Sequence, residues 1–169
     1  MGITVTKDVN NVPKLLETIE KLKNQKIQVG ILSKADGKML MIATVHEFGC
    51  TIEVTDKMRA YLNSQGLHLK KDTKVINIPQ RSFIRAGFDE NEQNIISRMQ
   101  ALIEKVIFDE LDINDFYEFI GNYCVGKLQE FLVNLDNPSL SSYTIEKKGS
   151  SNPLIDTGHL KDTITFEIV

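Results

Sequence analysis

Hydrophobic residues recur at helical spacing in three stretches of the chain. The first is "NVPKLLETIEKLKN" at residues 11–24, where Asn11 stands before Pro13 as an expected helix cap. The other two stretches are longer and run from about residue 82 to 108 and from about 113 to 135. Apolar residues three or four positions apart form one face of a helix, so each stretch predicts an amphipathic helix.

Shorter apolar runs fill the rest of the chain. Four of them predict strands: "KIQVGIL" at 26–32, "CTIEV" at 50–54, "VINIP" at 75–79 and "TITFEIV" at 163–169. Two more predict short helices that end at Gly49 and Gly66. This order favours an α+β fold, with a mostly antiparallel sheet, two long helices packed on one face, a short N-terminal helix and a C-terminal strand.

The 169 residues fit a single domain, 1–169, that is large enough to bury a core. Within it, residues 50–80 form an expected insertion of strand, helix and basic loop. Residues 136–153 are rich in Ser, Asn, Pro and Gly, which predicts a long, mobile loop.

Composition narrows the class of protein. Hydrophobic residues make up 41% of the chain and charged residues 25%, as in soluble globular proteins. With a net charge of −3, the protein as a whole is not expected to attract nucleic acid or an anionic membrane surface. No apolar run approaches the ~20 residues of a membrane span. The first residues do not resemble a signal peptide; Gly2 and Thr6 fit a loose myristoylation pattern, but no basic cluster follows. Two distant cysteines, Cys50 and Cys124, favour a reducing, cytoplasmic setting.

Charge is unevenly distributed along the chain. Residues 57–85 hold seven Lys or Arg against one acid, and residues 89–136 hold eleven acids against three bases. Unlike patches on one chain suit head-to-tail contact between copies, although two solvated faces would give the same pattern.

"PLIDTGHL" at 153–160 contains Asp156-Thr157-Gly158, which looks like the active-site loop of an aspartic protease. Such proteases need two aspartates in one site and a long segment after the loop, whereas only eleven residues follow Gly158. We therefore expect Asp156 or Thr157 to cap a short helix, with Gly158 easing the turn into it.

Two further stretches invite a chemical interpretation. His46-Glu47 begins like a zinc-protease helix, but Cys50 stands where the second His is needed, and nothing visible orients a Cys–His nucleophile. We expect His46 to pack and hydrogen-bond at a helix end. The basic loop 68–74, with Lys70, Lys71 and Lys74, could touch DNA phosphates non-specifically or could simply be solvated. We predict no catalytic, cofactor-binding or metal-binding residue; a small peptidase using Asp156 or Cys50/His46 and a DNA-binding accessory protein remain the alternatives.

Three segments in order carry a resemblance: "ATVHEFG" at 43–49, "IPQRSFIRAGFDEN" at 78–91 and "NPLIDTGHLKDTITFEIV" at 152–169. Together they resemble the tail-completion and neck proteins of tailed bacteriophages and prophages, the families labelled virion morphogenesis or head–tail joining. Gln80 stands where an acidic residue is common in that family, and Ser82 where proline is common.

The resemblance implies a structural α+β protein without enzyme activity or cofactor, assembled in the bacterial cytoplasm and located in a virion or phage-like particle. It implies a ring of six or twelve copies, because phage tails are sixfold, between head-closure or portal-side proteins and tail-terminator or tail-tube proteins. Arg81 and Arg85 would lie near the ring contacts, with Lys70, Lys71 and Lys74 as further partner contacts. Asp156, Thr157 and Gly158 would form a structural turn that leads through a short helix into the final strand.

Overall fold

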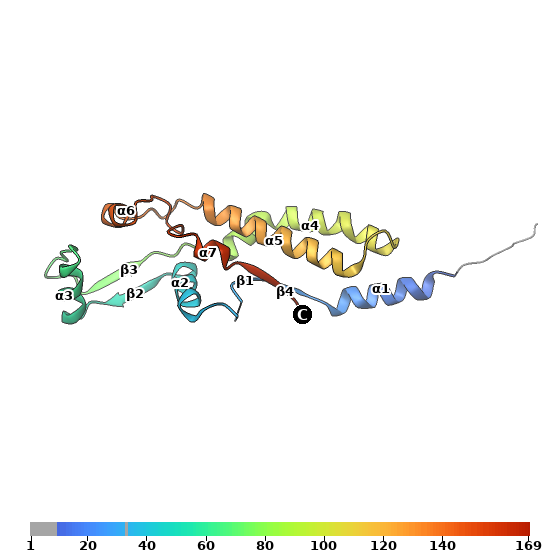
Figure 1. Cartoon of the computed structure of the whole chain (residues 1–169), viewed down its shortest axis with the longest axis horizontal. Helices are drawn as coiled ribbons and strands as arrows, with labels where there is room; N and C mark the ends of the chain where they lie inside the picture. Colours follow the sequence, from blue (N-terminus) through green and yellow to red (C-terminus); the bar gives the residue numbers. More distant parts are fainter. Residues whose placement is uncertain (1–9, 33) are drawn as a thin grey trace, which may run out of the picture.

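The computed structural model describes residues 10–32 and 34–169, so the Gly2–Thr6 pattern lies outside the described residues. The fold mixes helices and strands, as predicted (Figure 1). In chain order the elements are α1 (Val12–Asn24), β1 (Ile27–Gly30), α2 (Gly37–Phe48), β2 (Cys50–Glu53), α3 (Asp56–Ser64), β3 (Val75–Ile78), α4 (Arg85–Ile107), α5 (Ile113–Asn134), α6 (Ser142–Lys148), α7 (His159–Asp162) and β4 (Thr165–Ile168).

The strands form two separate antiparallel ribbons rather than one sheet. β1 pairs with β4, with Val29 opposite Phe166, and β2 pairs with β3, with Ile52 opposite Ile76. Antiparallel pairing was predicted, but the division into two ribbons was not. In the chain α2 lies between β1 and β2, and the second ribbon extends away from α4 and α5 (Figure 1).

The two long helices α4 and α5 pack against each other, and α5 also covers the β1–β4 ribbon. Glycines allow both close approaches. A Cβ at Gly87 would lie 3.0 Å from Leu128, and one at Gly121 would lie 2.2 Å from Phe166. The helices therefore meet each other and the ribbon at distances that a larger residue would prevent.

Two clusters of buried side chains form the core. One surrounds Phe83 and Leu132 and joins α2, α5 and the C-terminal segment; the other surrounds Phe116 and Ile120 and joins α4 and α5 to the end of α1. Both clusters lie in the body formed by α4, α5 and the β1–β4 ribbon. The apolar faces that the sequence predicted for the long helices pack inside this body.

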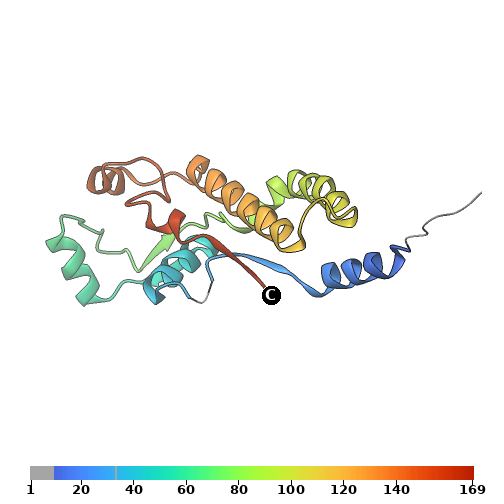
Figure 2. The same cartoon turned by 45° about the vertical axis from the view of Figure 1, so that its right-hand side comes forward.

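Residues 50–78 form an arm that extends from one end of the molecule (Figure 2). It consists of the β2–β3 ribbon with α3 and the loop 65–74 at its far end. None of residues 50–80, all of which are described, is buried. Thr55 caps α3 by accepting a hydrogen bond from the Met58 amide, and Gly66 turns the chain with φ 84°. The predicted insertion of strand, helix and basic loop therefore has its own local structure.

The segment 136–153 is not a loop throughout, because it contains α6. The Ser141 side chain accepts a hydrogen bond from the Thr144 amide at the start of this helix, and Gly149 ends it in the left-handed conformation with φ 69°. In the sequence pattern, serine and glycine residues predict a loop here. Here they are the start and stop signals of a short helix.

The two predicted helix caps have different outcomes. At α1, Asn11 is the N-cap residue and Pro13 lies in the first turn, as predicted, but the Asn11 side chain makes no capping hydrogen bond; Asn10 accepts one from the Val12 amide. At α7 the N-cap residue is Gly158, with φ 84°, and no side chain of the described residues caps it. Asp156 and Thr157 are exposed in the bend that precedes Gly158, so the turn leads through a short helix into β4 without the expected cap.

Candidate functional site

The ends of two segments distant in sequence meet where α2 stops. Gly49, with φ 75°, turns the chain out of α2 into the arm, and the returning chain passes the same point after β3. There the Arg81 amide donates a hydrogen bond of 2.7 Å to the carbonyl oxygen of His46. We call the cluster of Glu47, Arg81, Ser82 and Arg85 the Glu47 junction.

The carboxylate of Glu47 is the centre of this junction. Glu47 is only 7% exposed, and its two oxygens accept hydrogen bonds from the start of α4. The donors are the Ser82 hydroxyl at 2.7 Å, the amides of Phe83, Ile84 and Arg85 at 2.8, 3.0 and 3.1 Å, and Arg85 Nε at 2.9 Å. Ile84, the N-cap residue of α4, offers no side-chain cap; a side chain from α2 therefore accepts from the Ile84 and Arg85 amides, and the Ser82 hydroxyl accepts from the Ala86 amide at 3.3 Å.

These contacts determine the protonation of Glu47. Burial acts to raise the pKa of its carboxyl, but the hydrogen bonds from Ile84, Ser82 and Arg85 outweigh burial, and the pKa lies below its ordinary value. The negative charge also faces the amides at the N-terminus of α4, where the helix dipole favours an anion. Glu47 is therefore ionised while the junction is intact.

Arg81 and Arg85 are engaged within the chain. Arg81 is 5% exposed, and its guanidinium donates to the carbonyl oxygens of Pro138 at 2.7 Å and Ser139 at 3.1 Å. Arg85 donates to the backbone oxygen of Glu47 at 2.9 Å and lies over the ring of Phe48, 4.5 Å from its centroid. Arg81 is thus placed to hold the chain after α5, whereas half of the Arg85 side chain faces solvent.

A cleft of about 300 Å³ lies beside the junction, between β1, α2 and the start of α4. Its lining is mainly apolar, including Val29, Leu40 and Ile84, with Glu47 and Arg85 as the charged residues. The cleft brings together side chains from three of the segments that the sequence analysis considered separately.

His46 does not make the hydrogen bond that we expected. Its Nδ1 is buried, and no partner for it is found among the described residues. Burial, together with the positive charges of Arg81 and Lys148, lowers the pKa of His46 below its ordinary 6.5. Cys50 lies in β2, opposite Ile78, at the base of the arm. Within residues 10–32 and 34–169, no three His, Cys, Asp or Glu side chains are grouped so that they could hold a metal ion.

Asn152 makes the side-chain hydrogen bonds of the turn at residues 152–155, and the sequence analysis did not single it out. Its side-chain oxygen accepts hydrogen bonds from the amides of Leu154 and Ile155 at 3.0 and 2.9 Å, and its nitrogen donates to the Val133 carbonyl at 2.6 Å. An Asn that bonds to amides two and three residues later is a common turn signal, so the sequence did contain it. Leu154 follows into the core.

The predicted partner lysines lie on the arm, away from the junction. Lys70, Lys71 and Lys74 are exposed in the loop after α3. Arg59 gives this loop its shape, because its guanidinium donates to the carbonyl oxygens of Lys70 at 2.7 Å and Thr73 at 2.6 Å. The loop is therefore hydrogen-bonded internally, and its three lysines share one end of the arm.

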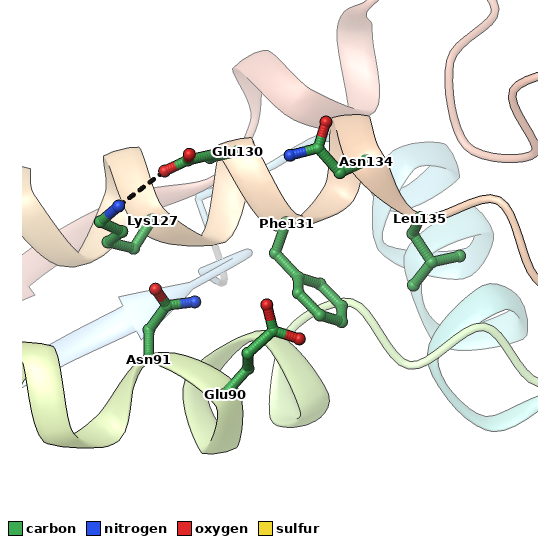
Figure 3. Close-up of a pocket in the computed structure, with 7 residues that line it drawn as sticks. All are labelled: Glu90, Asn91, Lys127, Glu130, Phe131, Asn134 and Leu135. Carbon is green, nitrogen blue, oxygen red and sulfur yellow. Dashed lines mark hydrogen bonds and ion pairs between the residues drawn. The ribbon is translucent and has the colours of Figure 1, made fainter.

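A second hollow, of about 220 Å³, lies between α4 and α5. Figure 3 shows Glu90 and Asn91 of α4 on one side and Lys127, Glu130, Phe131, Asn134 and Leu135 of α5 and its end on the other. Lys127 pairs with Glu130 at 2.7 Å. The hollow lies beside the close approach of the helices at Gly87, whose missing Cβ leaves Phe131 in contact with α4.

The chain matches no family model, no curated protein and no solved structure. None of the helices in residues 10–32 and 34–169 is both long and apolar enough to cross a membrane. The functional conclusion therefore depends on the residues and their geometry.

Proposed function

We propose that this chain is a structural protein of the head–tail junction in a tailed bacteriophage, prophage or phage-like particle, of the tail-completion or neck type. The observation that supports the proposal is that three segments distant in sequence lie together in the structure. The three segments that carry the resemblance meet in one core cluster, to which they contribute Ala43, Phe83 and Leu154. The first two segments also share the Glu47 junction. Residues of the resembling segments are thus part of one of the two core clusters of this fold.

The shape of the chain agrees with a role in assembly. The arm extends from one end and α1 from the other, so the chain can reach neighbours on both sides of its body (Figure 2). We propose a ring of six or twelve copies in which the lysines of the arm meet the acidic helices α4 and α5 of the next copy. A heterologous contact of this kind makes a ring when it closes. Head-closure or portal-side proteins and tail-terminator or tail-tube proteins would flank the ring.

Removal of the gene from the phage that carries it tests the proposal. We expect full capsids and separate tails that fail to join, seen by electron microscopy, and joining should return when the gene is supplied in trans. Normal infectious particles without the gene would contradict the proposal.

Charge reversal tests the contact made by the arm. Lys70, Lys71 and Lys74 changed together to Glu should leave the melting temperature nearly unchanged and still prevent joining, because these side chains are exposed. The matched control changes three exposed lysines outside the arm and outside α4 and α5, Lys23, Lys38 and Lys147, to Glu; its net charge is the same, and joining should persist. Equal joining by both variants would remove the arm from the contact.

The alternatives have their own tests. Digestion of denatured casein by the purified chain, lost in Asp156→Ala or Cys50→Ala, would establish a peptidase and overturn a purely structural role. Salt-sensitive retention of double-stranded DNA, lost in the triple arm variant but kept in its control, would instead make the hydrogen-bonded basic loop a DNA contact.

A further inference from the structure

The β1–β4 ribbon has two strands, so each strand has one edge without a neighbouring strand. At one end of the ribbon, Lys26 and Val169 exchange two backbone hydrogen bonds, of 2.7 and 2.9 Å. Bonded and non-bonded pairs alternate along an antiparallel ladder, so Ile27 and Val29 direct their amides and carbonyl oxygens away from β4. Within the described part of the chain, these outward groups have no hydrogen-bond partner. The outer edge of β1 is therefore open to a further strand.

The two edges of the ribbon have different surroundings. The cleft of about 300 Å³ beside the Glu47 junction is lined by residues 29–32, α2 and the start of α4, and by no residue of β4, a strand that is described in full. The cleft therefore lies on the outer side of β1, next to a stretch without a charged residue. On the side of β4, Lys34 pairs with Glu167 at 2.7 Å beside another hollow. Charged side chains commonly protect an edge strand, so β1 offers the more accessible edge.

One segment of the chain has the pattern of a strand that would fit this edge. Ile3-Thr4-Val5-Thr6, which lies outside the described residues, consists of four β-branched residues, the type that favours strands. Apolar and polar residues alternate in it, as they do in β1, where Ile27 and Val29 pack toward the helices and Gln28 is exposed. A strand with this alternation beside β1 would continue both faces of the ribbon, one apolar and one polar.

This segment cannot reach β1 of its own chain. Thr6 is four residues from Asn10, and an extended chain of that length spans at most about 14 Å. The thirteen residues of α1 follow, with a length of about 20 Å, and α1 points away from the ribbon (Figure 1, Figure 2). The open edge of a second copy is not subject to this restriction.

We propose that residues Ile3–Thr6 of one copy add as an antiparallel strand to the outer edge of β1 in another copy. Antiparallel addition continues the ladder of the ribbon and is the more stable pairing. With Ile3 and Val5 on the same face as Val29, their amides donate to β1, and the Thr4 amide points away from it. The segment and the edge are different surfaces, so the contact is heterologous and links copies head to tail. The inference needs only two copies of the chain and does not depend on the proposed function.

A peptide of residues 2–9, added to the ¹⁵N-labelled full chain, tests the strand addition by NMR. We expect saturable binding up to about 1 mM peptide, with amide hydrogen exchange at Ile27 and Val29 slowed about tenfold or more. A peptide N-methylated at Val5 cannot donate to β1 and should bind at least about tenfold more weakly. N-methylation at Thr4 is the matched control, because this amide faces away, and the affinity should stay within about threefold. Absence of binding, equal effects of the two methylations, or protection of the β4 edge instead overturns the proposal.

Sedimentation of the full chain tests whether a second copy is the occupant. From about 1 µM to about 1 mM we expect association that increases with concentration, and Val5→Pro should raise its dissociation constant about tenfold or more. Thr4→Pro, which removes the amide that faces away, is the control and should have the smaller effect. Equal melting temperatures of the two variants exclude a general loss of folding. A full chain that stays monomeric over this range, or two variants that associate equally, overturns the proposed pairing.

Discussion

The body and the arm are held together by different means. In the body, Phe83, Phe116 and Ile120 are almost completely buried, and a buried carboxylate joins α2 to α4. In the arm, none of residues 50–80 is buried, and its shape comes from strand pairing, the Thr55 cap and the two hydrogen bonds of Arg59. Stability should therefore depend on the body, whereas the arm can change its surface at little cost to folding.

Glu47→Ala should produce the largest loss of stability. The change leaves the amides of Phe83, Ile84 and Arg85 without their acceptor in a mostly buried place, so we expect the free energy of unfolding to fall by about 3 kcal/mol. Urea denaturation measures this loss. Glu53→Ala, an exposed acid in the arm, is the control and should stay within about 0.5 kcal/mol. Equal stability of the two variants would show that the junction does not hold the body.

Gly121→Ala should destabilise the contact between α5 and the β1–β4 ribbon. The added Cβ would lie 2.2 Å from the Phe166 ring, and overpacking of this kind costs roughly 1–3 kcal/mol. Gly126→Ala lies on the same helix with no atom within 4 Å of the added Cβ, so it should stabilise the chain by up to about 1 kcal/mol. Thermal melts of the two variants that move in the same direction would be inconsistent with this packing.

Acid should weaken the body through His46. Its folded-state pKa lies below the ordinary 6.5, so the unfolded chain takes up the proton first, and stability falls as the pH drops from about 6.5 toward the folded-state pKa. His46→Gln should flatten the pH dependence of unfolding in this range, and His68→Gln, an exposed histidine of the arm, should leave it unchanged. A curve that His46→Gln does not alter would exclude His46 as its source.

Arg59→Ala should have the smallest effect on global stability. The substitution frees the carbonyls of Lys70 and Thr73, which can bond to water, so the free energy of unfolding should change by no more than about 0.5 kcal/mol. Amide hydrogen exchange in residues 67–74 should nevertheless become faster, and Lys57→Ala should not have this effect. A loss of about 2 kcal/mol would mean that the arm contributes to the fold as the body does.

The sequence by itself determined the local elements. Apolar spacing predicted α4 and α5, alternation predicted the four strands, and Gly49 and Gly66 marked the ends of α2 and α3. These signals are local, because a glycine with positive φ or a stripe of period 3.6 has the same meaning wherever the chain goes. The α6 helix was not predicted, because serine and glycine, the residue types at 141 and 149, are also common in loops.

The tertiary structure alone decided what the charged residues do. Glu47 resembled half of a zinc motif, yet it caps a helix that begins 38 residues later, at Arg85. Arg81 belonged to a basic segment, yet it is buried against the carbonyls after α5. Asp156 resembled a catalytic aspartate or a cap, yet it is exposed, and Asn152 makes the hydrogen bonds of the turn just before it. Unlike apolar residues, charged residues do not recur with a period that reveals their environment. The role of each depends on the partner that folding places beside it.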